Sequence, residues 1–192
     1  MTTIVAVKKN GVAVIAADTL TTFGNTRLHA LQDSSHDKIL HIGDNYIGVC
    51  GSAAHHLVLN SLLTKSPEVQ LSSKASIFET FRKLHPVLKE ECFLNPKEDE
   101  EDPYESSQFT ALIANASGIF GIYSMREVFE YTQFWAIGSG HEFALGAMHC
   151  AYKQVESAEE IARIGLEAGI AYDKNSSAPI TLYSVMLTCQ TG

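Results

Sequence analysis

The sequence has few basic residues and lacks any long apolar run. Its 14 lysines and arginines face 22 aspartates and glutamates, which gives a formal net charge of -8. Because nucleic acids and anionic membranes are bound through basic surfaces, neither is expected as a partner. No stretch approaches the ~18 apolar residues of a membrane-spanning helix, and the first residues lack a secretory signal pattern. We therefore expect a protein of the cytoplasm.

Cysteine is also scarce and scattered, with four residues and no C-x-x-C pair. The eight histidines show no metal-ligand spacing, and there is no G-x-S-x-G, P-loop or G-x-G-x-x-G motif. We expect no metal ion and no cofactor. With 192 residues, 45% of them hydrophobic, the chain is long enough for one well-packed core, and we expect a single domain over residues 1–192.

Apolar runs and turn signals predict an α+β fold. Residues 3–7 and 11–17 are nearly continuous apolar strands joined at Asn10-Gly11, a strong hairpin signal, and burial on both faces is expected. Further strands are expected in five segments, "KILHI", "YIGVCGS", "FTALIAN", "IFGIYS" and "APITLYSVMLT", and "VFEYTQFWAIGSG" alternates like one more. Helices are expected over about 53–65, 73–91 with a kink or end at Pro86, 141–155 and 158–172. Strands in blocks with helices in pairs indicate two packed sheets covered by helices on both outer faces.

Two loops have a composition of their own. Residues 19–38 are polar and rich in glycine, serine and asparagine, so an irregular loop with a short extended stretch is expected. Residues 95–108 hold six acids and two prolines without an aliphatic side chain, which is typical of a solvated loop.

An apolar strand is expected directly after the first residues, "MTT", which indicates that Thr2 is held in place and available for use. Initiator methionine is normally removed before a small residue, which would leave Thr2 with a free α-amine beside its own hydroxyl. Such an amine can act as general base for the hydroxyl, because its ordinary pKa of about 7.7–8 suits proton transfer at neutral pH. A Met-Thr start is also common in proteins without this chemistry, and the residue alone does not decide between the two.

Three other places could carry chemistry, each with an ordinary structural alternative. Asp18 ends an apolar strand and Lys38 opens the next; they form either a charged pair beside Thr2 or an ordinary ion pair. "GVCGSAA", with Gly51, leads from a strand into a helix, which favours an oxyanion site or a tight turn. Ser139 in "AIGSG" and the pair Asp173 and Ser176 after a helix are either site residues or caps.

Six features of the sequence, taken in order, resemble the proteasome β-type subunits. They are "TTIVAVKKNGVAVIAAD", "FGNT", a lysine before the next strand, "CGSAA", "AIGSG" and D-x-x-S. The likeness covers almost the whole chain and is strongest to the bacterial HslV type and to stand-alone bacterial proteasome homologues. These are N-terminal-nucleophile (Ntn) hydrolases. The resemblance implies a four-layer αββα sandwich, which agrees with the element order read from the residues, and a threonine endopeptidase that needs no cofactor.

The resemblance also implies a role for each matching residue. Thr2 would be nucleophile and base, with Asp18 and Lys38 as the charged pair beneath it, and Ser139, Asp173 and Ser176 would orient the amine. The Gly51 amide would bind the oxyanion, Gly51 and Thr22 would hold an extended peptide, and Val49 and Ala53 would line the pocket for its side chain. Self-association into stacked rings is implied, with unfolded protein or peptide as substrate and room for an ATP-dependent unfoldase as partner.

The sequence departs from the pattern at Ser177, where the family often has glycine, and in the acidic loop, which has no counterpart. Two alternatives remain open. One is an Ntn amidase that acts on a small amide instead of a peptide, and the other is a proteolytically silent ring-forming scaffold. The presence of Thr2, Asp18 and Lys38 together argues against the scaffold, which has no need of that set.

Overall fold

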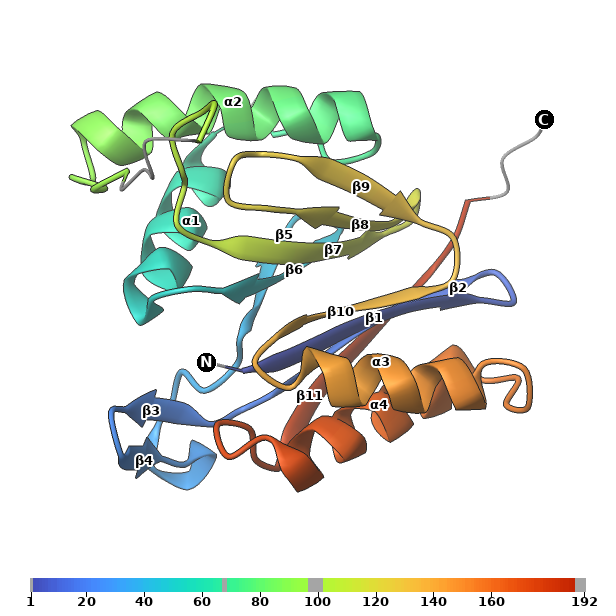
Figure 1. Ribbon diagram of the computed structural model, residues 1–192. Helices are drawn as coiled ribbons and strands as arrows, with labels where there is room; N and C mark the ends of the chain where they lie inside the picture. Colours follow the sequence, from blue (N-terminus) through green and yellow to red (C-terminus); the bar gives the residue numbers. More distant parts are fainter. Residues whose placement is uncertain (1, 67–68, 97–101, 189–192) are drawn as a thin grey trace.

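The computed structural model describes residues 2–66, 69–96 and 102–188. Two antiparallel sheets lie face to face in the centre of the molecule (Figure 1). The four-stranded sheet has the order β10-β1-β2-β11, with the bounds Phe134–Gly138, Thr3–Lys9, Val12–Asp18 and Ile180–Met186. The five-stranded sheet runs β5-β6-β7-β8-β9, with the bounds Ile39–Ile42, Asn45–Cys50, Thr110–Asn115, Gly118–Ile122 and Val128–Tyr131.

One pair of helices covers each outer face (Figure 1). The five-stranded sheet is covered by α1, Ala53–Lys65, and α2, Lys74–Glu90, and the four-stranded sheet by α3, His141–Ala151, and α4, Ala158–Tyr172. The layers follow the order helix, sheet, sheet, helix, so the predicted αββα sandwich is confirmed. Among the described residues, no helix is long and apolar enough to cross a membrane.

The β1–β2 hairpin shows why its strands are apolar on both faces. Ile4, Ala6 and Ile15 pack between the two sheets, whereas Val5 and Val14 pack against α3 and α4. The turn at Asn10 and Gly11 has positive φ at both residues, 50° and 76°, as a two-residue hairpin requires. Since β1 lies between β10 and β2, the strand that begins at Thr3 is held in the middle of a sheet.

Four predicted features differ from the structure. Residues 19–38 contain a small hairpin of β3, Thr21–Phe23, and β4, Thr26–Leu28, followed by a 3-10 turn, Ala30–Gln32, in place of a mostly irregular loop. Helix α3 ends at Ala151 and not near residue 155, which is the second difference. Helix α2 runs close to its expected bounds and does not end at Pro86, because the buried Leu88 holds the turn beyond it in the core.

The alternating segment near residue 130 is two strands in different sheets, the third difference. Strand β9 pairs with β8, and β10 pairs with β1, so the chain crosses from one sheet to the other between them. The rings of Tyr131 and Trp135 stack at 5.0 Å across this crossing. A strict alternation of apolar and polar residues does not reveal such a crossing, because both strands have one buried face.

The acidic loop is the fourth difference, because its end is not solvated. Ser106 and Ser107 are buried, and the Ser107 hydroxyl lies 3.0 Å from Nδ1 of His85. Glu105 pairs with Nε2 of His85 at 3.0 Å and with Lys89. Residues 97–101 of the same loop lie outside the described residues.

Candidate active site

Thr2 lies directly before the central strand β1, against a turn that requires glycine. Its side chain is buried, and its carbonyl accepts the Ser139 hydroxyl at 3.4 Å and the Gly140 amide at 3.5 Å. Gly138 has φ +93°, and a Cβ there would stand 2.1 Å from the Thr2 carbonyl oxygen. The "GSG" that ends β10 therefore allows the close approach that holds Thr2 in place. Met1 lies outside the described residues.

Asp18 ends β2 directly beside Thr2 and is fully buried. Its carboxylate accepts the Thr2 hydroxyl and the Lys38 ammonium, the latter at 2.8 Å. It also accepts the amides of Thr3, Leu20 and Ser177 at 3.0, 3.0 and 3.2 Å. Five donors fix both oxygens, which is what a buried carboxylate needs to stay charged.

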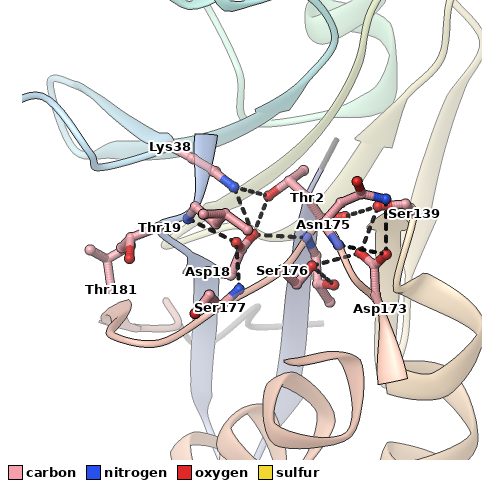
Figure 2. Close-up of polar contacts among 12 residues, drawn as sticks. Thr2, Asp18, Thr19, Lys38, Ser139, Asp173, Asn175, Ser176, Ser177 and Thr181 are labelled. Atoms are coloured by element: carbon pink, nitrogen blue, oxygen red, sulfur yellow. Dashed lines mark hydrogen bonds and ion pairs between the residues drawn. The ribbon is translucent and has the colours of Figure 1, made fainter. Parts of the chain in front are cut away.

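Lys38 completes a triangle with the other two side chains (Figure 2). Its Nζ donates to Oγ1 of Thr2 and to Oδ1 of Asp18, both at 2.8 Å, and its side chain is 14% exposed. Burial lowers the pKa of Lys38, while Asp18 acts in the opposite direction. The hydroxyl of Thr2 thus accepts from a cation and donates to an anion, an arrangement that can stabilise charge developing on its oxygen.

A second polar cluster lies on the main-chain side of Thr2 (Figure 2). Oδ2 of Asp173 accepts the hydroxyls of Ser139 at 2.6 Å and Ser176 at 2.8 Å, and Oδ1 accepts the Asn175 amide at 3.1 Å. Burial alone would raise the pKa of Asp173, but the hydrogen bonds from Ser139, Ser176 and Asn175 outweigh it, so the pKa lies below its ordinary value. The structure therefore brings together all six residues that the sequence pattern picked out for catalysis.

Thr3 joins the two clusters and was missed by the sequence reasoning. Its amide donates to Asp18, and its hydroxyl lies 2.7 Å from that of Ser176. A Cβ at Gly140 or Gly169 would come within 2.1 Å or 2.7 Å of the Thr3 side chain. The two adjacent threonines at the start of a buried strand were the only signal available.

Two clefts meet at Thr2. The lysine-side cleft, about 360 Å³, contains Lys38 and the four residues predicted for substrate binding, which are Thr22, Val49, Gly51 and Ala53. The aromatic cleft, about 820 Å³, opens on the other side and is lined by Phe109, Tyr123, Trp135, Ser139 and others. Thr2 and Gly51 belong to both, so the threonine stands where the two clefts join.

Gly51 lies at the turn from β6 into α1 and has no room for a side chain. A Cβ there would approach Nδ1 of His55 to 2.9 Å and Cβ of Phe109 to 3.2 Å. The next amide, that of Ser52, donates to Nδ1 of His55 at 3.1 Å, in a cap that starts α1. The amide of Ser52 is thus engaged within the turn, which leaves Gly51 as the candidate donor to a ligand.

Ser177, the departure noted in the sequence, does not disturb the turn that carries Ser176. It is not among the described residues with positive φ, so the turn does not require glycine there. Its amide donates to Asp18 and its carbonyl accepts the Thr19 amide at 3.3 Å. The contacts are made by the backbone and do not depend on the side chain.

Comparison with known proteins gives consistent matches. A model of the proteasome subunit family matches residues 1–71. The structure of BPH from Thiobacillus denitrificans is 39% identical in sequence, with a TM-score of 0.92, and the match covers 97% of this chain and 99% of that one. The structure of the same protein in complex with epoxomicin has 38% identity and a TM-score of 0.90, again over 97% and 99% of the two chains. Eukaryotic HslV from Trypanosoma brucei, at 21% identity and TM-score 0.66 over 96% and 99% of the two chains, shares the fold. No curated protein matches the chain.

Proposed function

The chain belongs to the proteasome subunit family, with the β-type Ntn-hydrolase fold, and from this premise we propose that it is an N-terminal threonine peptidase. One observation carries the proposal. The Thr2 hydroxyl is hydrogen-bonded to Lys38 and Asp18 at the junction of two open clefts. A buried ion pair in contact with a single hydroxyl is costly to build and gives that oxygen a defined charge environment.

The proposed reaction begins after Met1 is removed. The α-amine of Thr2 takes the proton of its own Oγ1, which attacks the peptide carbonyl carbon. The Lys38 ammonium stabilises the attacking oxygen, and the Gly51 amide is the proposed donor to the oxyanion. The C–N bond then breaks and the amine passes its proton to the leaving nitrogen, which leaves an ester on Oγ1. The same amine next takes a proton from water, the water oxygen attacks the ester carbon, and the proton returns to Oγ1 as the C–O bond breaks.

Each of the other site residues has a proposed part. Ser139, Asp173 and Ser176 orient the main chain of Thr2 and hence its amine, a role supported by the Ser139 bond to the Thr2 carbonyl. Thr22 and Gly51 hold the acyl half of the substrate as an added strand in the lysine-side cleft. Val49 and Ala53 give that cleft a modest apolar wall for one side chain.

Assembly and location belong to the same proposal. We propose that copies of this chain form two stacked rings that enclose the active sites, in the cytoplasm, with unfolded protein or peptide as substrate. An ATP-dependent unfoldase is the class of partner that such restricted access would require. The family supports ring assembly, and the number of subunits is to be measured by native mass spectrometry.

Two other functions would give different results in a test with a peptide-like inhibitor. A small-amide hydrolase of the same superfamily would form the same acyl-enzyme but would ignore extended peptides. A silent ring-forming scaffold would form no acyl-enzyme at all. The contacts of Thr2 with Lys38 and Asp18 favour an active hydrolase over the scaffold.

The deciding experiment is intact mass spectrometry of the purified chain with and without epoxomicin, the ligand of the BPH complex. A peptide epoxyketone reacts with both the hydroxyl and the free α-amine of an N-terminal threonine. Loss of Met1 with one adduct per chain is the expected result, and Thr2→Ala should form none. Retained Met1 without an adduct would overturn the peptidase proposal and favour the scaffold.

A further inference from the structure

The aromatic cleft has no part in the reaction proposed above, although it is the larger of the two clefts that meet at Thr2. Its volume is about 820 Å³, against about 360 Å³ for the lysine-side cleft. Three aromatic side chains, Phe109, Tyr123 and Trp135, line it together with small hydroxyl residues such as Ser106 and Ser124. Concave apolar surface of this size beside a reactive group is typical of a binding site.

The walls of the aromatic cleft are held in place before any ligand binds. Nε1 of Trp135 donates to the Tyr123 hydroxyl at 2.7 Å, and that hydroxyl lies 3.2 Å from that of Tyr131. The indole of Trp135 also stacks on Tyr131, and Phe109 is buried against Phe81 at 5.9 Å. Because the rings are already fixed, a ligand would pay little entropy to order them.

The chemistry of acyl transfer decides which half of a substrate would enter. The base that takes the proton of the hydroxyl must later deliver it to the leaving nitrogen, so the leaving half lies on the side of that base. Lys38 and Asp18 contact the hydroxyl of Thr2, whereas Ser139 contacts its main chain from the other side (Figure 2). Gly138 and Ser139 line the aromatic cleft, so this cleft lies on the leaving-group side.

Resting on the proposed peptidase activity, we propose that the aromatic cleft binds the residue that follows the scissile bond and selects bulky apolar side chains there, aromatic ones above all. The leaving amine carries this residue, and its ring packs against Trp135, Tyr123 and Phe109. A glycine at the same position would leave the cleft filled with water, and an aspartate would place a negative charge against the rings. Selection by the leaving half thus adds to any selection by the smaller lysine-side cleft.

The test uses internally quenched peptides that share one sequence and differ only in the residue after the scissile bond, which is Phe, Trp, Leu, Gly or Asp. Mass spectrometry of the products confirms the cleavage position, and kcat/KM is measured for each peptide. For the unsubstituted protein we expect kcat/KM for the Phe and Trp peptides to exceed that for the Gly peptide at least tenfold, and the Asp peptide to be cleaved most slowly. Trp135→Ala and Tyr123→Ala should reduce the Phe-to-Gly ratio to threefold or less, while cleavage of the Gly peptide continues.

Two variants make the result independent of folding defects. If Trp135→Ala loses its stacking on Tyr131 and fails to fold, Tyr123→Ala carries the test alone. Phe78→Ala, on the outer helix α2 and outside both clefts, removes an aromatic ring elsewhere on the molecule and should leave the ratio unchanged. Equal cleavage of the Phe and Gly peptides, or a preference for Phe over Gly that is unchanged in Tyr123→Ala, would overturn the inference about the aromatic cleft but leave the peptidase proposal intact. Failure of the full chain to cleave any peptide would overturn the peptidase proposal as well.

Discussion

The two carboxylates beside Thr2 are both buried, but their negative charges are stabilised in different ways. Asp18 is 0% exposed and faces the Lys38 ammonium, whereas Asp173 is 7% exposed and accepts hydrogen bonds from the neutral groups of Ser139, Ser176 and Asn175. The hydroxyl side of Thr2 thus has a charge pair, and the main-chain side has a network of dipoles. Removing one partner of a buried charge pair leaves the other charge uncompensated, which is costly. Removing one donor from a network of neutral hydrogen bonds leaves the other bonds in place, so the cost is smaller.

The largest expected effect comes from breaking the charge pair at its anion. Asp18→Asn leaves the buried Lys38 ammonium without its partner and removes the charge that the Thr3, Leu20 and Ser177 amides face. We expect a loss of about 3–5 kcal/mol in the free energy of unfolding. Chemical denaturation with urea measures it, with Asp173→Asn as the matched control, for which about 1–2 kcal/mol is expected. Equal losses in the two variants would show that the two clusters do not differ as described.

The cation of the same pair affects activity more than folding. Lys38→Ala removes the ammonium that donates to the Thr2 hydroxyl, while Asp18 keeps its three backbone amides. We expect peptide hydrolysis to fall at least ~10³-fold, the scale of losing one preorganised donor at a reacting oxygen. The chain should still fold and elute at the same size in gel filtration. Full activity in this variant would contradict the proposed mechanism.

The dipole network predicts a weaker effect that depends on pH. The pKa of Asp173 is lowered in the folded chain, where burial raises it but the hydrogen bonds from Ser139, Ser176 and Asn175 lower it more. The unfolded chain, with an Asp pKa of about 3.9, therefore binds more protons between the two pKa values, and the stability that this carboxylate contributes is lost as pH falls through that window. Thermal midpoints measured from pH 7 to pH 2 should fall less steeply below pH 4 in Asp173→Asn than in the parent. Parallel curves would mean that the network does not favour the charged carboxylate.

The smallest effect concerns Cys50, which lines both clefts beside the charge pair. Burial raises the pKa of its thiol to about 12, so it stays protonated at neutral pH and is a poor nucleophile. Iodoacetamide at pH 7.5 should label the exposed Cys150 and leave Cys50 unmodified, with less than a twofold change in peptidase activity. Peptide mapping locates the label. Inactivation that persists in Cys150→Ser would indicate a role for Cys50 beside Thr2.

Much of the fold could be predicted from local patterns. The continuous apolar strands of β1 and β2, the Asn10-Gly11 turn and the bounds of α1 follow from short-range sequence features, and the order of elements indicated four layers. The crossing between β9 and β10 could not be predicted in this way. Local patterns also left open whether α2 ends at Pro86 or continues through it. Both depend on packing against segments distant in sequence, such as the stacking of Trp135 on Tyr131.

The candidate site likewise has features that could be predicted from the sequence and features that could not. The sequence by itself determined the residue types, which are a threonine at position 2, a carboxylate at a strand end and a lysine before the next strand, and it left each of them with an ordinary structural alternative. Only the tertiary structure decided that Thr3 joins the two clusters, that Asp18 is held by three amides, and that an aromatic cleft opens beside Thr2. These features depend on close approach between segments up to 173 positions apart, as with Thr3 and Ser176, and local sequence patterns contain no measure of that distance.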